Sequence, residues 1–458
     1  MRKFHVLSGL QVCVLPCFLA VLLCTSSYAQ SQPGDADPVK IAEKFAGHFT
    51  SGRYAEAVKL FGDEAAKALP EAKLKEVWES LSTSVGDFES FGKPTTSKTG
   101  PRTAVIIPVT FKKAGLNFRI IVNTEGRIDG FLIQPGGPAV EYKPAEYDKP
   151  KRYREKDVTF GKEPWLVKGK LTLPKSKKDV PAVVLVHGSG PNDEDETIGP
   201  NKPFRDLAGG LSSQGIAVLR YPKRTYAYGP QMVKQKTISV REEVIDDALE
   251  ALKFLRSQKG IDGSQVYLLG HSLGATLAPA IAAEDKDLAG VIMLAGSPRN
   301  FADVIEDQLT YIASLPGPGQ EGNKKVLEES RDVLAKLRDG SAPPDAKLLG
   351  APAPYWKEVS EYSTKSPGLL AGLKCPLLIA GGGRDYQVTR SDFDIYKKAL
   401  KDRELCEFKW YKSMSHLFMR GKGKATPDEY AQTGHVDEKV VDDLAGWIKA
   451  DRRAHGMK

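Results

Sequence analysis

The segment Gln265-Val266-Tyr267-Leu268-Leu269-Gly270-His271-Ser272-Leu273-Gly274 decides the fold of this chain. Its first five residues form a short apolar stretch with the β-branched and aromatic content of a buried parallel strand. Residues 275–283 are small and compatible with a helix in spite of one proline. The G-x-S-x-G pattern between strand and helix is typical of a strained turn that exposes a serine hydroxyl, with glycines where Cβ atoms would crowd the backbone. The segment therefore predicts Ser272 as a nucleophile at a strand end.

From about residue 155 onward, strand-like runs alternate with helical patterns. The strand-like runs cover residues 165–173, 182–186, 216–220, 265–269, 290–294, 377–380 and 407–411, and the clearest helical pattern covers 240–255. Such alternation predicts a mostly parallel sheet with helices on both faces. In sheets of this kind, the groups that act on a ligand gather at the carboxyl ends of the strands.

Three of the predicted strands lead directly into chemically useful groups. His187-Gly188-Ser189-Gly190-Pro191 follows the run 182–186, Asp385 follows 377–380 after three glycines and an arginine, and His416 comes shortly after 407–411. Glycines let a backbone N–H approach a developing oxyanion, and an aspartate can orient a histidine that takes a proton from serine. Alone, Asp385 is more typical of a cap or turn and His416 of a packed histidine. Together with Ser272, in this order, they predict a catalytic triad.

Other histidines offer alternatives to His416. His435 also follows the last predicted strand, but it lies in a polar run just before an amphipathic helical pattern, a position suited to capping that helix. His416 lies within a short loop's reach of the strand end, so we assign the general base to it. His271, beside the serine, and His187, in the glycine-rich loop, are expected to support the turn and to organise the loop.

With these motifs in view, residues from about 155 to 455 resemble the α/β-hydrolase superfamily and, within it, the bacterial EstD-type carboxylesterases. Serine, aspartate and histidine occur in the chain order of this superfamily, which differs from the trypsin and subtilisin orders. Further motifs that carry the resemblance are HGSGPND at 187–193, LRYPKR at 219–224 and EEVIDDA at 242–248. Pro222 stands where such esterases usually have an acidic or similar polar residue.

The resemblance implies an α/β-hydrolase fold and the hydrolysis of carboxylic esters of modest size, with no metal and no cofactor. Ser272 then attacks the ester carbonyl, His416 takes its proton and later gives it to the leaving alcohol, and Asp385 orients the imidazole. The backbone N–H groups of Ser189 and Leu273 stabilise the oxyanion of the tetrahedral intermediate.

The same residues leave other reactions open. A serine peptidase uses the same triad, and an aminopeptidase-like enzyme would need lid carboxylates for a free amine, for which Glu328 and Glu329 are candidates. An acyltransferase or thioesterase would differ only in its acceptor or its substrate. A binding module on a silent scaffold is disfavoured, because no member of the triad is missing.

Residues 36–137 show two patterns in turn. From 38 to 81 the apolar residues recur at helical spacing, whereas 103–133 contains strand-like runs and a hairpin turn at Asn123-Thr124-Glu125-Gly126. Helices followed by an antiparallel sheet predict a small α+β domain, which resembles the nuclear-transport-factor-like modules found ahead of bacterial hydrolases. Gly136-Gly137-Pro138 ends this domain, and residues 138–154 are predicted to be a linker.

Within the hydrolase-like domain, residues 155–455, a long insertion at about 298–370 predicts a helical lid over the strand ends. Its helical patterns near 301–315 and 324–337 are separated by segments rich in proline and glycine. Tyr311, Tyr355 and Trp356 either face the acyl or alcohol pocket or only pack the lid onto the sheet, and the sequence leaves both possibilities open.

Residues 1–29 have the pattern of a secretory signal peptide. A positive start is followed by a mostly apolar run from Val6 to Leu23, too short and too interrupted for a membrane span, and then by small residues at the cleavage positions. We expect cleavage after Ala29 and export, to the periplasm or as a secreted protein. Cys375 and Cys406 would remain in an oxidising compartment, where a structural disulfide between them stays an open possibility.

Length and composition limit the partners. A chain of 458 residues predicts two or three domains. The net charge is +8, but lysines and arginines are scattered among acidic residues without a basic and aromatic stretch, which disfavours nucleic-acid binding. We therefore expect a small-molecule ester as substrate and no integral membrane segment after cleavage. The natural ester, the oligomeric state and the role of the first domain are not predicted.

Overall fold

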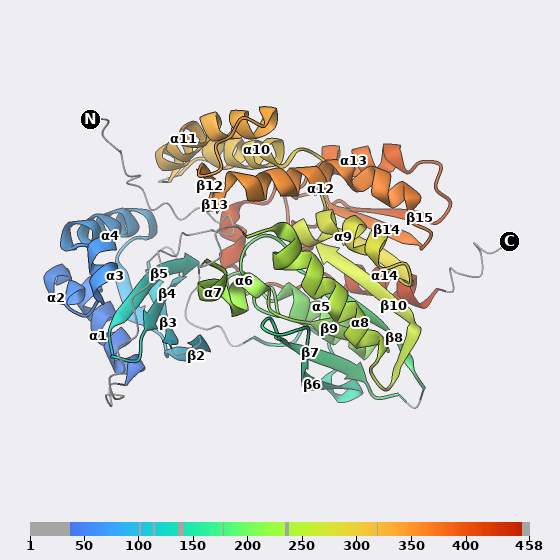
Figure 1. The fold of residues 1–458 in the computed structure, drawn as a ribbon, viewed down its shortest axis with the longest axis horizontal. Coiled ribbons are helices and arrows are strands. Elements are labelled where there is room, and N and C mark those ends of the chain that lie inside the picture. The colour runs from blue at the N-terminus through green and yellow to red at the C-terminus, as the bar shows by residue number, and fades with distance from the viewer. Residues whose placement is uncertain are drawn as a thin grey trace.

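A computed structural model describes residues 37–99, 102–112, 115–135, 142–176, 178–233, 238–317 and 319–450. The predicted signal peptide and the Gly136–Pro138 boundary lie outside these residues. A small N-terminal body, blue in Figure 1, lies beside a larger body that runs from green to red.

The N-terminal body packs helices against an antiparallel sheet. Its elements are α1 (Pro38–Thr50), α2 (Tyr54–Val58), α3 (Asp63–Ala68), α4 (Glu71–Val85), β1 (Phe88–Phe91), β2 (Thr95–Thr99), β3 (Arg102–Phe111), β4 (Gly115–Val122) and β5 (Ile128–Pro135). The strand order is β1-β3-β4-β5, with β2 paired to β3. Helix α1 begins where the Asp37 side chain accepts a hydrogen bond from the N–H of Val39, 2.9 Å away. Phenylalanine rings from α1 and the sheet pack edge to face in the core, which confirms the predicted α+β domain.

An eight-stranded sheet forms the centre of the larger body. Its strands are β6 (Tyr153–Phe160), β7 (Val167–Pro174), β8 (Val180–Val186), β9 (Ala217–Arg220), β10 (Ile261–His271), β11 (Gly290–Leu294), β14 (Leu377–Gly382) and β15 (Cys406–Tyr411). They lie in the order β15-β14-β11-β10-β8-β9-β7-β6, parallel from β15 to β9 and antiparallel from β9 to β6. The predicted mostly parallel sheet is confirmed. Strand β6 was not predicted as a strand because most of its side chains are polar and exposed, as suits a sheet edge.

Helices cover both faces of this sheet (Figure 1). One face is covered by α8 (Asp246–Arg256) and α9 (Leu273–Glu284), and the other by α5 (Pro203–Ser213) and α14 (Glu438–Lys449). A π-helical turn at Arg241–Ile245 directly precedes α8. Consecutive residues of β8 point to opposite faces, so Val184 packs with α8 and α9 while Val183 packs with α5 and α14. Both faces are buried, which explains the unbroken apolar run of this strand.

The predicted lid consists of α10 (Phe301–Ser314), α11 (Gln320–Asp339), a short hairpin of β12 (Lys347–Leu348) and β13 (Ala351–Pro352), and α12 (Ala353–Gly372). It lies along the upper edge of Figure 1, with α12 against α9. The remaining short elements are α6 (Arg224–Ala227), α7 (Gly229–Val233), α13 (Arg390–Ala399) and 3₁₀ turns at Pro150–Arg152 and Pro427–Ala431. None of the helices in the described ranges is long and apolar enough to cross a membrane.

Cys375 lies just before β14, and Cys406 begins the neighbouring strand β15, where it is the register partner of Leu377. The two sulfurs do not form a disulfide in the described part of the chain. Burial raises the pKa of Cys406 to about 12, so this side chain stays a thiol at neutral pH.

Candidate functional site

Ser272 occupies a sharp turn between β10 and α9. Its backbone angles are φ 53° and ψ −117°, a conformation that is unfavourable for any residue with a side chain. The turn is held by the Ser272 N–H, which donates to the Leu294 carbonyl at 2.8 Å. A Cβ on Gly274 would lie 2.1 Å from the Val186 carbonyl oxygen, and one on Gly270 would lie 2.3 Å from that of Gly274. The two glycines of the motif therefore permit the backbone approach that exposes the serine.

Asp385 and His416 form a buried pair at the ends of neighbouring strands. Asp385 follows β14, His416 follows β15, and their Oδ2 and Nδ1 atoms are 2.7 Å apart. Asp385 Oδ1 also accepts hydrogen bonds from the N–H groups of Gln387, at 2.7 Å, and Val388, at 3.1 Å. These contacts hold the carboxylate in place and orient the imidazole with its Nε2 directed away from the aspartate.

The His416 loop lies directly beside the serine turn. The ring centroids of His271 and His416 are 4.9 Å apart, and His271 Nε2 lies 3.0 Å from the His416 carbonyl oxygen. Leu417 and Phe418, which follow His416, are both buried and anchor the loop in the core. The structure thus brings the Asp385–His416 pair close to the turn that carries Ser272, more than a hundred positions earlier in the sequence.

The glycine-rich loop after β8 lies against the nucleophile. A Cβ on Gly188 would be 3.1 Å from Ser272 Cβ and 3.6 Å from its Oγ. Within the described ranges, the backbone N–H groups of Ser189 and Leu273 donate to no protein acceptor. Both N–H groups that the sequence singled out therefore remain available for an oxyanion.

Glu196 is a part of the site that the sequence did not predict. Its side chain is fully enclosed, and its Oε1 accepts a hydrogen bond from the Gly188 N–H at 2.5 Å. Its Oε2 lies 2.9 Å from His271 Nδ1. Burial alone would raise the pKa of Glu196, but the neighbouring His271 lowers it below its usual value. The acidic run 193–196 carries no pattern that distinguishes Glu196 from its three acidic neighbours, of which Asp195 is also buried.

The pKa of His271 is shifted in the opposite direction to that of Glu196. Burial acts to lower its pKa, but the Glu196 carboxylate and the His416 carbonyl outweigh burial and raise it. Its Nδ1 lies 2.9 Å from Glu196 Oε2 and its Nε2 lies 3.0 Å from the His416 carbonyl oxygen. His187 differs, because its ring packs between Phe204 and Tyr221 and burial lowers its pKa to about 4. His187 is therefore a neutral packed ring at the base of the glycine-rich loop.

His435 lies in a separate cluster. Its Nδ1 is 2.9 Å from Asp206 Oδ1 on α5, and the Val436 N–H donates to Asp206 Oδ2 at 2.9 Å. The hydrogen bond to Asp206 raises the pKa of His435. This position explains the residue as a link between α5 and the start of α14.

The lid aromatics pack inside the protein. Tyr355 and Trp356 on α12 are buried; the Tyr355 hydroxyl donates to Glu243 Oε2 at 2.7 Å, and Trp356 stacks on Phe301. Tyr311 on α10 donates its hydroxyl to the Ala425 carbonyl at 3.0 Å. Of the two possibilities left by the sequence, these contacts match the packing of the lid onto the sheet.

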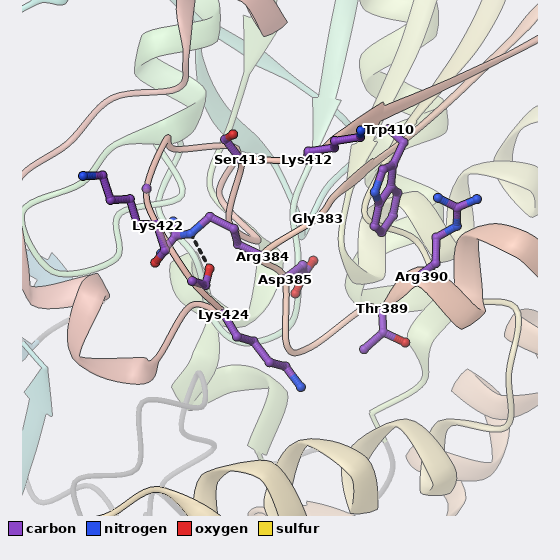
Figure 2. Close-up of a pocket in the computed structure, with 12 residues that line it drawn as sticks. Gly383, Arg384, Asp385, Thr389, Arg390, Trp410, Lys412, Ser413, Lys422 and Lys424 are labelled. Carbon is purple, nitrogen blue, oxygen red and sulfur yellow. Dashed lines mark hydrogen bonds between the residues drawn. The ribbon is translucent and has the colours of Figure 1, made fainter.

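A cavity of about 650 Å³ lies behind Asp385 (Figure 2). Its wall is basic and includes Arg390, whose guanidinium stacks on the Trp410 ring at 5.0 Å, and three lysines. Ser272 and His416 do not line this cavity. Asp385, which lines the cavity, is the one residue that it shares with the predicted triad. Among the described residues, no group of three or more histidine, cysteine, aspartate or glutamate side chains is placed to hold a metal ion.

Comparison with known proteins gives the same division of the chain. A family described as the alpha/beta hydrolase family matches residues 183–433, and one described as a protein of unknown function (DUF3887) matches residues 42–131. Esterase EstD of Thermotoga maritima is 40% identical over 404 residues, which cover 88% of this chain and 93% of that protein.

Solved structures with a similar course of the chain include several esterases. Brefeldin A esterase, a bacterial homologue of human hormone sensitive lipase, has a TM-score of 0.42 and 15% identity over 69% of this chain and 81% of its own. Est1E from Butyrivibrio proteoclasticus has a TM-score of 0.41 and 14% identity over 64% and 97%. An acylaminoacyl peptidase of Pyrococcus horikoshii has a TM-score of 0.46 and 12% identity over 79% and 56%.

Proposed function

The chain belongs to the alpha/beta hydrolase family, as a relative of Esterase EstD, and on that premise we propose that it hydrolyses carboxylic esters through a Ser-His-Asp triad and an acyl-enzyme intermediate. The observation that carries the proposal is the buried Asp385–His416 pair, 2.7 Å between Oδ2 and Nδ1, beside a serine held at φ 53°.

In this mechanism each group has one task. The Ser272 hydroxyl loses its proton to His416 and attacks the ester carbonyl carbon, forming a tetrahedral oxyanion. The N–H groups of Ser189 and Leu273 donate to that oxyanion, and each such donor contributes roughly 3–4 kcal/mol to the barrier reduction. His416 then gives its proton to the leaving alcohol, and a water molecule repeats the sequence to release the acid. Asp385 stabilises the imidazolium formed in between.

The experiment compares substrate classes on the purified chain. We expect hydrolysis of p-nitrophenyl esters, with a preference among chain lengths that reports the acyl pocket, and little activity on amino-acid p-nitroanilides. Faster cleavage of the anilides would instead support a peptidase. Preferential transfer of the acyl group to an added alcohol or thiol would support an acyltransferase.

We propose further that the chain is exported and that residues 1–29 are removed. The positive start, the short apolar run and the small residues before Gln30 support this proposal. Intact mass and N-terminal sequencing of the protein from its native host should give a chain that begins at Gln30, outside the cytoplasm. A cytoplasmic chain that keeps residues 1–29 would contradict it.

A further inference from the structure

A buried lysine that the mechanism above does not use holds the glycine-rich loop. Lys223 comes from the segment after β9, and its Nζ donates to the Gly188 carbonyl oxygen at 3.1 Å. Asn192 Nδ2 donates to the same oxygen at 3.2 Å. The Lys223 side chain is only 2% exposed, and its ammonium lies 3.2 Å from Glu243 Oε1. A buried ammonium is unfavourable unless it is paired, so a lysine placed under one carbonyl next to the nucleophile requires an explanation.

The geometry of the Gly188–Ser189 peptide bond explains why a lysine is buried here. In a trans peptide the carbonyl and the following N–H point in opposite directions, and the single cis peptide among the described residues is Glu163–Pro164. An ammonium fixed on the Gly188 carbonyl therefore directs the Ser189 N–H away from Lys223. The positive charge also polarises this peptide, which strengthens its N–H as a donor.

Glu243 holds the lysine in place. Its Oε1 accepts a hydrogen bond from Thr225 Oγ1 at 2.8 Å, and its Oε2 accepts one from the Tyr355 hydroxyl at 2.7 Å. Burial and the Glu243 charge hold the pKa of Tyr355 well above its usual range, so this hydroxyl remains a donor. Glu243 is thereby fixed between the Thr225 segment and lid helix α12, with the Lys223 ammonium beside it.

We propose that Lys223, held by Glu243, is a positioning residue of the oxyanion hole: it orients and polarises the Gly188–Ser189 peptide so that the Ser189 N–H meets the oxyanion formed on the ester carbon. The inference rests on the proposed function, and in it Lys223 acts through the Gly188–Ser189 peptide. Lys223 touches neither the substrate nor the triad.

Replacement of Lys223 by methionine keeps an unbranched side chain that reaches as far as Cε and removes the charge and the donors of Nζ. For Lys223→Met we expect kcat on a p-nitrophenyl ester to fall by about 10²-fold, the effect of losing one oxyanion donor, with KM changed by less than about threefold. Inhibition by a trifluoromethyl ketone, which forms the same tetrahedral oxyanion on Ser272, should weaken in proportion to kcat/KM.

A second variant separates positioning from stability. Lys223→Met leaves the Glu243 carboxylate buried and unpaired, which lowers Tm, whereas the double variant Lys223→Met, Glu243→Gln removes both charges. We expect Tm to recover in the double variant while kcat stays low. The matched control is the Arg256–Asp285 ion pair, 2.7 Å, at the opposite end of β10 from Ser272. Arg256→Met should lower Tm and leave kcat unchanged.

Recovery of kcat together with Tm in the double variant, or an effect on KM alone, would show that Lys223 is merely structural and would overturn the inference. The proposed function has its own readout in the same assay. A wild-type chain without esterase activity, or activity that survives Ser272→Ala, overturns both. An active wild type with an unimpaired Lys223→Met variant overturns only the role of Lys223.

Discussion

Asp385 and Glu196 are both buried carboxylates beside a histidine, yet the second ring nitrogens of the two histidines have different surroundings. Asp385 Oδ2 lies 2.7 Å from Nδ1 of His416, and in the proposed mechanism the other ring nitrogen exchanges a proton with Ser272. Glu196 Oε2 lies 2.9 Å from His271 Nδ1, and the second ring nitrogen of His271 lies 3.0 Å from the His416 carbonyl oxygen. The first pair suits catalysis and the second ties the serine turn to the loops on either side.

The Glu196–His271 pair predicts a pH-dependent contribution to stability. The pKa of His271 is raised in the folded protein, so its contribution to the unfolding free energy is fully present below about pH 6.5 and is lost as the pH rises through the folded pKa. The pKa of Glu196 is lowered, so its contribution is present above about pH 4.5 and is lost as the pH falls through the folded pKa. Urea unfolding of wild type and of the double variant Glu196→Gln, His271→Gln should differ most between these two pH values. A difference in unfolding free energy that is constant from pH 4 to 9 would contradict the charged pair.

The two histidines that follow the last strand give a second prediction. His416→Ala should lower kcat by at least ~10⁴, as loss of a triad member does, because it removes the group that we assign as the general base. His435→Ala removes only a contact to Asp206 and should change kcat by less than about tenfold. Steady-state kinetics on one p-nitrophenyl ester decides between them, and the reverse order would show that the general base is misassigned.

At the scale of elements, the turn between β10 and α9 depends on close backbone packing. A Cβ on Gly274 would collide with the Val186 carbonyl of β8, whereas one on Gly446, within α14, meets nothing within 4 Å. Backbone atoms cannot yield as a flexible side chain can, so the two glycines should respond oppositely to the same substitution.

Gly274→Ala should therefore destabilise the protein by about 3 kcal/mol or more, or prevent folding, because β8 and α9 must separate. Gly446→Ala should stabilise it by about 0.4–1 kcal/mol, since alanine restricts the unfolded chain and favours the helix. Thermal and urea unfolding measure both. Equal effects of the two substitutions would show that the turn is less tightly packed than described here.

Most of the strands and several helices of the larger body could be predicted from the sequence, because apolar runs and helical patterns alternate along it. Apolar runs followed directly by Ser272, Asp385 and His416 indicate strand ends, and parallel strands bring such ends to one edge. The sequence could not predict Glu196 or Lys223, because their partners lie on other segments and nothing local distinguishes a buried charge from an exposed one. Edge strand β6 was not predicted from the sequence, because most of its residues are polar and exposed and give no apolar pattern.

At the scale of the whole molecule, two cores are built from separate stretches of chain. The buried cluster of the N-terminal body draws only on residues 42–128, and the clusters around the large sheet draw on residues 158–448. One contact between the bodies places the Arg119 guanidinium 5.8 Å from the Tyr226 ring on α6. The groups assigned to the reaction all belong to the larger body.

A chain that begins at residue 142 should consequently fold and keep kcat on a short-chain p-nitrophenyl ester within about tenfold of the full chain, since the triad and both oxyanion donors remain. Circular dichroism and steady-state kinetics of the two chains test this. An unfolded shorter chain, or a folded one without activity, would show that the N-terminal body completes the site.

The central claim is that Ser272 is the nucleophile, and covalent labelling with a fluorophosphonate, followed by peptide mass spectrometry, tests it most directly. We predict one adduct, on the peptide that contains Ser272, and no adduct on a folded Ser272→Ala variant, which also loses ester hydrolysis. An adduct on another residue, or labelling and hydrolysis at the wild-type level in folded Ser272→Ala, would contradict the account.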